Sequence, residues 1–151
     1  MPKARRLREV GFEANEKEVL SSADAAASFL RRALPPKSPV LVVGEDALTS
    51  ALSRAGFRLV QEASETTAVV AALDRDVTWG KLTEATLAIR GGAMFVATNL
   101  DPTFPSERGL LPGAGALISL LETATGCHPI LIGKPEPLLY LEALEILQAP
   151  P

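Results

Sequence analysis

The sequence contains few of the residues on which many small proteins depend for cross-links, metal sites and catalysis. Its 151 residues include one cysteine, Cys127, and one histidine, His128. A single cysteine excludes an internal disulfide framework and a zinc site built on clustered cysteines. A single histidine leaves little for a mechanism based on histidine. Tryptophan and tyrosine also occur once each, and we expect Trp79 and Tyr140 to be packing residues on helices.

Long apolar runs and a strong charge of one sign are absent too. The apolar runs 40–43, 68–73 and 93–97 are each far shorter than the roughly 20 residues that a membrane-spanning helix needs. The basic start of the chain lacks the apolar segment of a secretory signal. The net charge of -3 argues against general binding to nucleic acids, which favours a basic face. We therefore expect a protein of the reducing cytoplasm, with neither a membrane nor a nucleic acid as partner.

Short apolar strands alternate with amphipathic helices along the chain. Ser21 and Asp24 have the spacing of a capping box, and Asp46 is placed to cap the next helix. Such alternation predicts an α/β fold, a three-layer sandwich with a mainly parallel central sheet. The polar stretch 98–109 is expected to be a loop. The expected strands are 40–43, 57–60, 68–73, 93–97 and 129–132, and the expected helices are 5–10, 21–34, 47–55, 78–90, 117–124 and 135–147.

Polar residues follow the predicted strands at 44–46, 74–76, 98–101 and 133–135. In an open parallel sheet these loops share the edge where function collects, although Asp and Asn also serve there as turn formers and helix caps. The glycines of 110–117 (LLPGAGAL) either cradle an anion at a helix start or form a tight loop-to-helix turn. Ile118 stands where a dinucleotide-binding fingerprint needs its third glycine, so that fingerprint is excluded.

Five segments occur in an order and at a spacing that resemble the haloacid dehalogenase superfamily. The similarity is to its branch of 4-nitrophenylphosphatase-like, pyridoxal phosphate and phosphoglycolate phosphatases, and it covers the chain from about Leu7 to Leu147. The segments are LDRDVTWGKL (73–82), ATNLDPTFP (97–105), LPGAGAL (111–117), LETATG (121–126) and GKPEP (133–137).

The resemblance implies a phosphomonoester hydrolase with a Rossmann-like core and a large α/β cap inserted into it. In that family an Asp pair of the core forms an aspartyl-phosphate, and acidic residues hold Mg²⁺. The resemblance further implies that this chain starts after the second core motif and ends before the metal motif. Residues 1–20 and 133–151 would be residual core segments, and 21–132 the cap. We expect this chain alone to lack the catalytic Asp pair and to bind no Mg²⁺.

The resemblance also assigns roles to single residues. Lys134 matches the family lysine that contacts the phosphate and the nucleophile, so it is expected to be both catalytic and substrate-binding. The stretch 99–105 matches the substrate-specificity loop of the cap, which makes Asn99, Asp101 and Phe104 candidate contacts to a small phosphorylated metabolite. Some relatives have a histidine where this chain has Phe104, and the phenylalanine favours an apolar or stacking contact.

Other interpretations of the same residues stay open. Asp74 and Asp76, with Thr78, match the D-x-D-x-T pattern of the nucleophile motif, and Thr98 and Lys134 would then match the next two motifs. In that case the metal motif would still be missing. A further alternative is a non-catalytic α/β module that binds an anion or a partner. The apolar faces within 4–12 and 135–147 need cover. They either pack on each other or drive the formation of a homo-oligomer.

Overall fold

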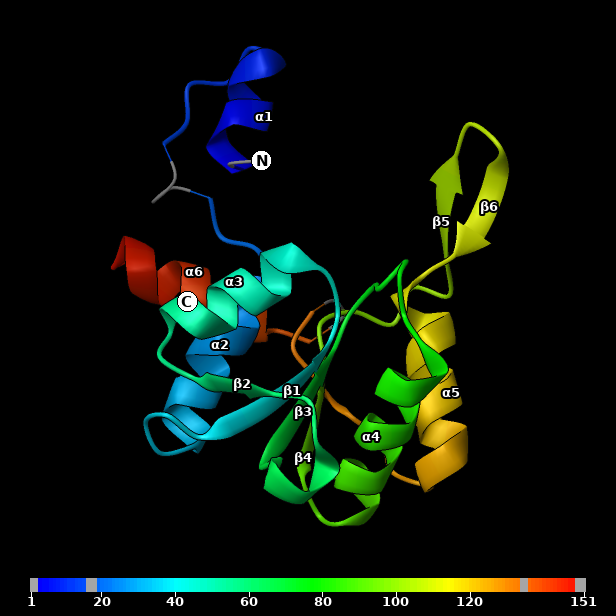
Figure 1. Ribbon diagram of the computed structural model, residues 1–151. Coiled ribbons are helices and arrows are strands. Elements are labelled where there is room, and N and C mark those ends of the chain that lie inside the picture. The colour runs from blue at the N-terminus through cyan, green and yellow to red at the C-terminus, as the bar shows by residue number, and fades with distance from the viewer. Residues whose placement is uncertain (1–2, 16–18, 134–135, 149–151) are drawn as a thin grey trace.

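The computed structural model describes residues 3–15, 19–133 and 136–148. Helices and strands alternate along most of the chain, as expected (Figure 1). The helices are α1 (Lys3–Glu9), α2 (Ser22–Ala33), α3 (Asp46–Arg54), η2 (Ala63–Glu65, a 3-10 helix), α4 (Trp79–Arg90), α5 (Ala114–Thr125) and α6 (Leu138–Leu147). The strands are β1 (Pro39–Val43), β2 (Arg58–Val60), β3 (Ala68–Ala71), β4 (Met94–Ala97), β5 (Thr103–Ser106), β6 (Gly109–Pro112) and β7 (Ile130–Leu131).

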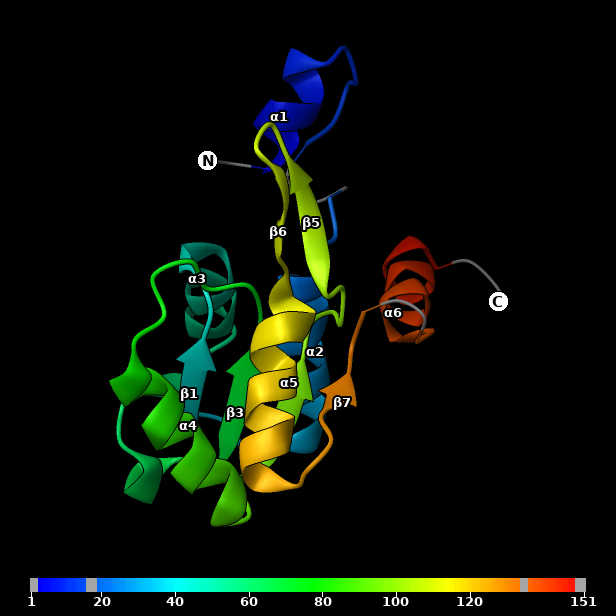
Figure 2. The same cartoon turned by 90° about the vertical axis from the view of Figure 1, so that its right-hand side faces the viewer.

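Five strands form one fully parallel sheet in the order β2-β1-β3-β4-β7. Helices α2, α3 and α6 lie on one face of this sheet, and α4 and α5 cover the other (Figures 1 and 2). The predicted α/β three-layer architecture is therefore confirmed. Parallel strands that are covered on both faces must be apolar on both sides, which explains why their sequences are continuous apolar runs.

Side chains along each central strand alternate between two hydrophobic clusters. In β1, Val40 packs with α2 and α3, whereas Leu41 and Val43 pack with α4 and α5. In β3, Val70 packs on the α2–α3 side and Val69 on the α4–α5 side. All five side chains are almost completely buried. This alternation follows from the two-residue period of a strand and anchors both helical layers to one sheet.

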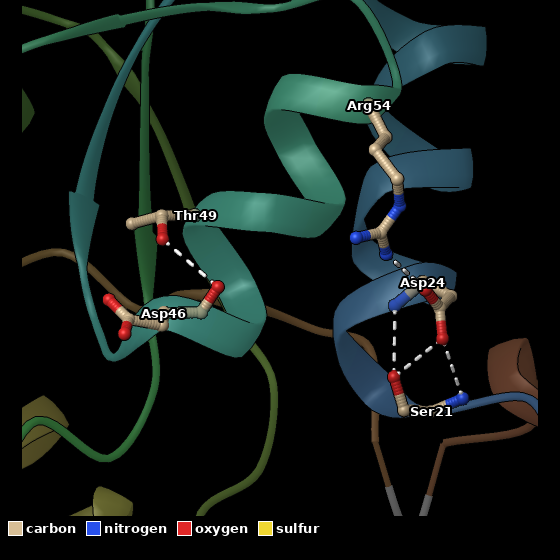
Figure 3. A network of polar contacts seen from close by, with 5 residues as sticks. All are labelled: Ser21, Asp24, Asp46, Thr49 and Arg54. Carbon is tan, nitrogen blue, oxygen red and sulfur yellow. Dashed lines mark hydrogen bonds and ion pairs between the residues drawn. The ribbon is translucent and has the colours of Figure 1, made fainter. Parts of the chain in front are cut away.

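The predicted capping box is present at the start of α2 (Figure 3). The Asp24 carboxylate accepts the Ser21 amide at 3.1 Å and the Ser21 hydroxyl at 2.7 Å, and the Asp24 amide donates to that hydroxyl oxygen at 3.3 Å. Arg54, the last residue of α3, forms an ion pair with Asp24, with Nη2 and Oδ1 3.6 Å apart. The prediction for Asp46 was wrong, because it is the first helical residue of α3. Glu45 occupies the N-cap position instead, without a side-chain cap.

Helix α6 packs on α2 through a buried carboxylate. The carboxylate of Glu142 accepts a hydrogen bond from Arg32 at 2.8 Å. Burial alone raises the pKa of Glu142, but hydrogen bonds from Ser28 and Arg32 outweigh it and hold the pKa below the ordinary value of 4.5. Leu138 and Leu139 complete this contact by packing on the α2–α3 side of the core.

Two expectations about local structure were wrong. The stretch 98–109 is not a continuous loop, because β5 lies within it and pairs with β6 in an antiparallel hairpin that projects from the body (Figure 2). Trp79 and Tyr140 lie on helices but do not pack, since they are 79% and 60% exposed. Among the residues that the structure describes, no helix is both long and apolar enough to cross a membrane.

Candidate functional site at the carboxyl edge of the sheet

The loops that follow the parallel strands meet at one edge of the sheet. Because all five strands run in the same direction, the segments after β1, β3, β4 and β7 leave from their carboxyl ends. The hairpin of β5 and β6 projects from this edge, between β4 and α5 (Figure 2). The polar residues that were singled out from the sequence therefore belong to the edge on which ligands of such sheets bind.

An ion pair connects the loop after β1 with the loop after β3. The Arg75 guanidinium binds the Glu45 carboxylate through two hydrogen bonds, Nε–Oε1 at 2.6 Å and Nη2–Oε2 at 2.9 Å. The hydrogen bond from Arg75 lowers the pKa of Glu45 below its ordinary value. Such bidentate pairing fixes the relative orientation of the two side chains in addition to pairing their opposite charges. It was missed in the sequence because the two residues are 30 positions apart.

Asp74 is a buried structural carboxylate. Its side chain is 3% exposed, its Oδ2 lies 2.7 Å from Lys81 Nζ, and its Oδ1 accepts the Asp76 amide at 3.1 Å. Both carboxylate oxygens are therefore engaged within the chain. Asp76 is exposed, and Thr98, from the next strand end, is buried. Lys81, the partner that sequence reasoning missed, lies three residues after the α4 cap Thr78.

Two of the acidic residues at this edge, Asp74 and Glu45, are not free to hold Mg²⁺. Mg²⁺ requires several oxygen ligands in near-octahedral geometry, and at least one carboxylate must be free to bind it. Asp74 is neutralised by Lys81, and Glu45 is paired with Arg75. Within the described ranges there is no group of three or more acidic, histidine or cysteine side chains that could hold a metal.

The segment after β4 is built from turns that three glycines make possible. The side-chain oxygen of Asn99 accepts a hydrogen bond from the Asp101 amide at 3.1 Å, which closes a local turn. A Cβ atom at Gly113 or Gly115 would overlap the carbonyl oxygens of Asp101 and Leu100, respectively, and one at Gly133 would overlap the carbonyl oxygen of Thr98. Only glycine allows the backbones to approach so closely.

The glycine pair at the start of α5 forms a tight turn rather than an anion cradle. The Gly113 amide donates to the Pro102 carbonyl at 2.8 Å, and the Gly115 amide donates to the Asp101 carbonyl at 2.9 Å. These N–H groups, which an anion would need, are already engaged. Of the two interpretations that the sequence left open, the structure supports the loop-to-helix turn.

The hairpin presents apolar side chains on both of its faces. Phe104 pairs with Leu111 across the strands and is half-buried, and Pro105 pairs with Leu110, which is 72% exposed. At the tip, the Ser106 hydroxyl donates to the Gly109 carbonyl at 2.8 Å and accepts the Arg108 amide at 3.1 Å. Gly109 has a φ of 110°, which this sharp turn requires.

The predicted site residues fall into three groups. Asn99, Asp101 and Phe104 share the segment that leads from β4 into the hairpin, where Asn99 and Phe104 are half-buried and Asp101 is exposed. Asp74 and Asp76 lie in the separate loop after β3. Lys134 lies outside the described residues.

This parallel three-layer fold, with a hairpin at its carboxyl edge, agrees with the comparisons with known proteins. The sequence profile of the haloacid dehalogenase-like hydrolases matches residues 2–58. The chain is 46% identical over 142 residues to a D-glycerol 3-phosphate phosphatase of Mycobacterium tuberculosis, a match that covers 93% of this chain and 40% of the relative. The chain resembles the haloacid dehalogenase-like hydrolases in sequence and in fold.

Other phosphatases show the same relation. An acid sugar phosphatase of Staphylococcus aureus is 44% identical over 142 residues, which is 94% of this chain and 54% of that protein. The structure of a glycerol phosphate phosphatase from M. tuberculosis in complex with magnesium aligns with a TM-score of 0.91 at 44% identity, over 96% of this chain and 45% of that one. A p-nitrophenyl phosphatase from Archaeoglobus fulgidus aligns with a TM-score of 0.89 at 36% identity, over 96% and 55%. The chain thus spans about half the length of the relatives it matches.

Proposed function

We propose that this chain forms the substrate-selecting cap, together with flanking core segments, of a phosphomonoester hydrolase. The observation that carries the proposal is that more than nine-tenths of the chain aligns, as one continuous fold, with roughly half of each of several phosphatases. A small phosphorylated metabolite is the substrate class that these relatives favour.

The proposed division places 21–132 in the cap and assigns 1–20 and 133–151 to the core. Helix α1 lies apart from the sheet in both views (Figures 1 and 2). Beyond it, Val10 and Phe12 are 68% and 65% exposed, so that this segment presents apolar surface that the described residues do not cover. Core segments that pack on other parts of a phosphatase would present such a surface.

In this proposal the hairpin selects the leaving group of the substrate. Phe104 and Leu111 form an apolar pair on one face, and such a surface favours an apolar or stacking contact with the organic part of a phosphate ester. Asn99 and Asp101 set the direction in which the hairpin leaves β4 through their shared turn. Lys134 would neutralise charge on the phosphate, which is what phosphoryl transfer demands of its surroundings.

An assay of the chain alone separates this proposal from the interpretation in which Asp74 is a nucleophile. The chain is incubated with 4-nitrophenyl phosphate and Mg²⁺, and release of 4-nitrophenol is followed for the original sequence and for Asp74→Asn. We expect no turnover from either protein, because both oxygens of Asp74 are engaged. Turnover that Asp74→Asn abolishes would overturn the assignment of this segment to a cap.

A hairpin exchange tests the selecting role directly. Residues 103–112 of this chain replace the aligned segment in the M. tuberculosis glycerol phosphate phosphatase, which keeps its own catalytic residues. We expect the ratio of kcat/KM for glycerol 3-phosphate to that for 4-nitrophenyl phosphate to change by about tenfold, equivalent to roughly 1.4 kcal/mol. The matched control exchanges the exposed segment 119–120 of α5 instead. An unchanged ratio in a folded hairpin chimera would contradict the proposal.

A further inference from the structure

A pocket of about 500 Å³ lies at the β2 side of the sheet, away from the hairpin. Its lining comes from β1 and β2, from Gly44 and Thr49 after β1, and from the first turns of α4. In the strand order β2-β1-β3, the strands that follow β1 in the chain lie on opposite sides of it. The topological switch point of this sheet, where open parallel sheets bind ligands beyond their carboxyl ends, therefore lies between β1 and β3. The pocket borders it through Gly44, which follows β1, and through Thr78, which follows β3 in the chain.

The lining of this pocket combines an apolar surface with a few polar side chains. Leu41, Leu59 and Val60 supply apolar area, and Glu62, Lys81 and Glu84 are its charged members. A volume of this size falls within the range of roughly 300–1,000 Å³ that is common for small-molecule sites. Neither the hairpin residues nor Asn99 contributes to the lining. The pocket is therefore separate from the proposed substrate-selecting surface.

The charge of the pocket is negative. Lys81, the one cation that the described residues contribute to the lining, is neutralised by the buried Asp74 carboxylate at 2.7 Å. Glu84 uses one carboxylate oxygen to accept the Ala63 amide at 2.7 Å, and this neutral donor leaves its charge uncompensated.

Nearby cations do not compensate this charge. Glu62 has no side-chain hydrogen bond or ion pair among the described residues. Arg58 and Arg75, which lie close in sequence to parts of the lining, are paired with Glu65 and Glu45. Two carboxylates beside an apolar surface favour a ligand that carries a positive charge on an apolar body.

We propose that this pocket binds a small organic cation, an amine attached to a short apolar body. The ammonium group lies near Glu62 and Glu84, and the apolar body lies against Leu59 and Val60. The site needs neither Lys134 nor the hairpin. The proposal of a cation site and the proposal of a phosphatase role can therefore be refuted independently of each other.

The test uses three probes that share one apolar body and differ in charge: benzylamine, benzyl alcohol and benzoate. Each is titrated to about 10 mM, where a ligand of millimolar Kd is mostly bound. Chemical shifts of the backbone amides are followed by NMR, which suits a protein of 15.9 kDa. We expect benzylamine to shift the amides of the pocket lining with a Kd at least fivefold lower than that of benzyl alcohol, and benzoate to bind weakest.

Two variants and one control locate the binding. At Gly80 an added Cβ meets only the Thr78 hydroxyl oxygen, at 3.9 Å, so Gly80→Leu adds volume to the lining without backbone strain. We expect Gly80→Leu to abolish the benzylamine shifts and Glu62→Gln to weaken benzylamine to the level of benzyl alcohol. Ser119→Leu, on the exposed surface of α5, is the control and leaves binding unchanged.

Three results would each overturn the proposal. The first is the absence of shifts with all three probes. The second is binding of benzoate as tight as that of benzylamine. The third is binding of benzylamine that persists in Gly80→Leu. Should Gly80→Leu fail to fold, as judged by its amide spectrum, Glu62→Gln decides alone, because it changes charge with almost no change in shape.

Discussion

The ion pair between the buried Asp74 and the partly exposed Lys81 predicts an asymmetry in stability that contact distance alone would not suggest. The two side chains share one contact of 2.7 Å, but Asp74 is 3% exposed and Lys81 is 36% exposed. In Lys81→Met the carboxylate stays buried without a counter-charge, at an expected cost of about 3–5 kcal/mol. In Asp74→Asn the lysine can turn to water, and the asparagine oxygen still accepts the Asp76 amide. This change should cost only about 1–2 kcal/mol.

Urea unfolding followed by far-UV circular dichroism measures both costs. We expect the midpoint to fall clearly further in Lys81→Met than in Asp74→Asn, with unchanged slopes, because the surface exposed on unfolding is the same. Thr83→Met on the outer side of α4 is the control for placing a methionine in that helix. Equal losses in the two variants, or a larger loss in Asp74→Asn, would refute the assignment of Asp74 as the buried and dependent partner.

Three further predictions concern other parts of the fold. Because the folded-state pKa of Glu142 is depressed, the stability it contributes is complete above about pH 4.5 and is lost as the pH falls through the folded value. Urea unfolding between about pH 5 and 3 should therefore depend less on pH in Glu142→Gln than in the original chain. Gly115→Ala forces a clash with the Leu100 carbonyl and should cost about 1–3 kcal/mol of stability in thermal unfolding. The control Gly80→Ala meets no such clash and should not destabilise the fold. Equal effects of the two substitutions would contradict the close packing at Gly115. The exposed Phe12 should promote self-association, so that Phe12→Ser lowers the mass measured by light scattering, and a clean monomer before substitution would count against this role.

The architecture could be predicted from the sequence because its signals are local. Continuous apolar runs such as 40–43 and 68–71 specify buried parallel strands, and the capping box of Ser21 and Asp24 marks the start of α2. The hairpin was missed for a physical reason. Pro105 and Pro112 argue against a strand, but in a two-stranded ribbon each strand is an edge, where a missing N–H group is tolerated.

The candidate site was harder to predict, because its contacts are non-local. The pairing of Glu45 with Arg75 depends on two loops that only the sheet brings together. The spacing of Asp74 and Asp76 matches a nucleophile motif, and no local pattern reveals that Lys81 engages the first of them. The exposure of Trp79 could not be predicted from the sequence either. Large aromatic residues are usually buried in part, but Trp79 lies on the solvent side of α4.

The way the hairpin is attached has a consequence for how such a protein can change over evolution. Its base is fixed by main-chain bonds from Gly113 and Gly115, which do not depend on the side chains of the strands. Among the described residues, none of 103–112 belongs to the buried hydrophobic core. Substitutions or insertions near the tip therefore leave the packing of the sheet and its helices intact. The sequence of the hairpin can therefore diverge while the parallel sheet and its helices stay the same.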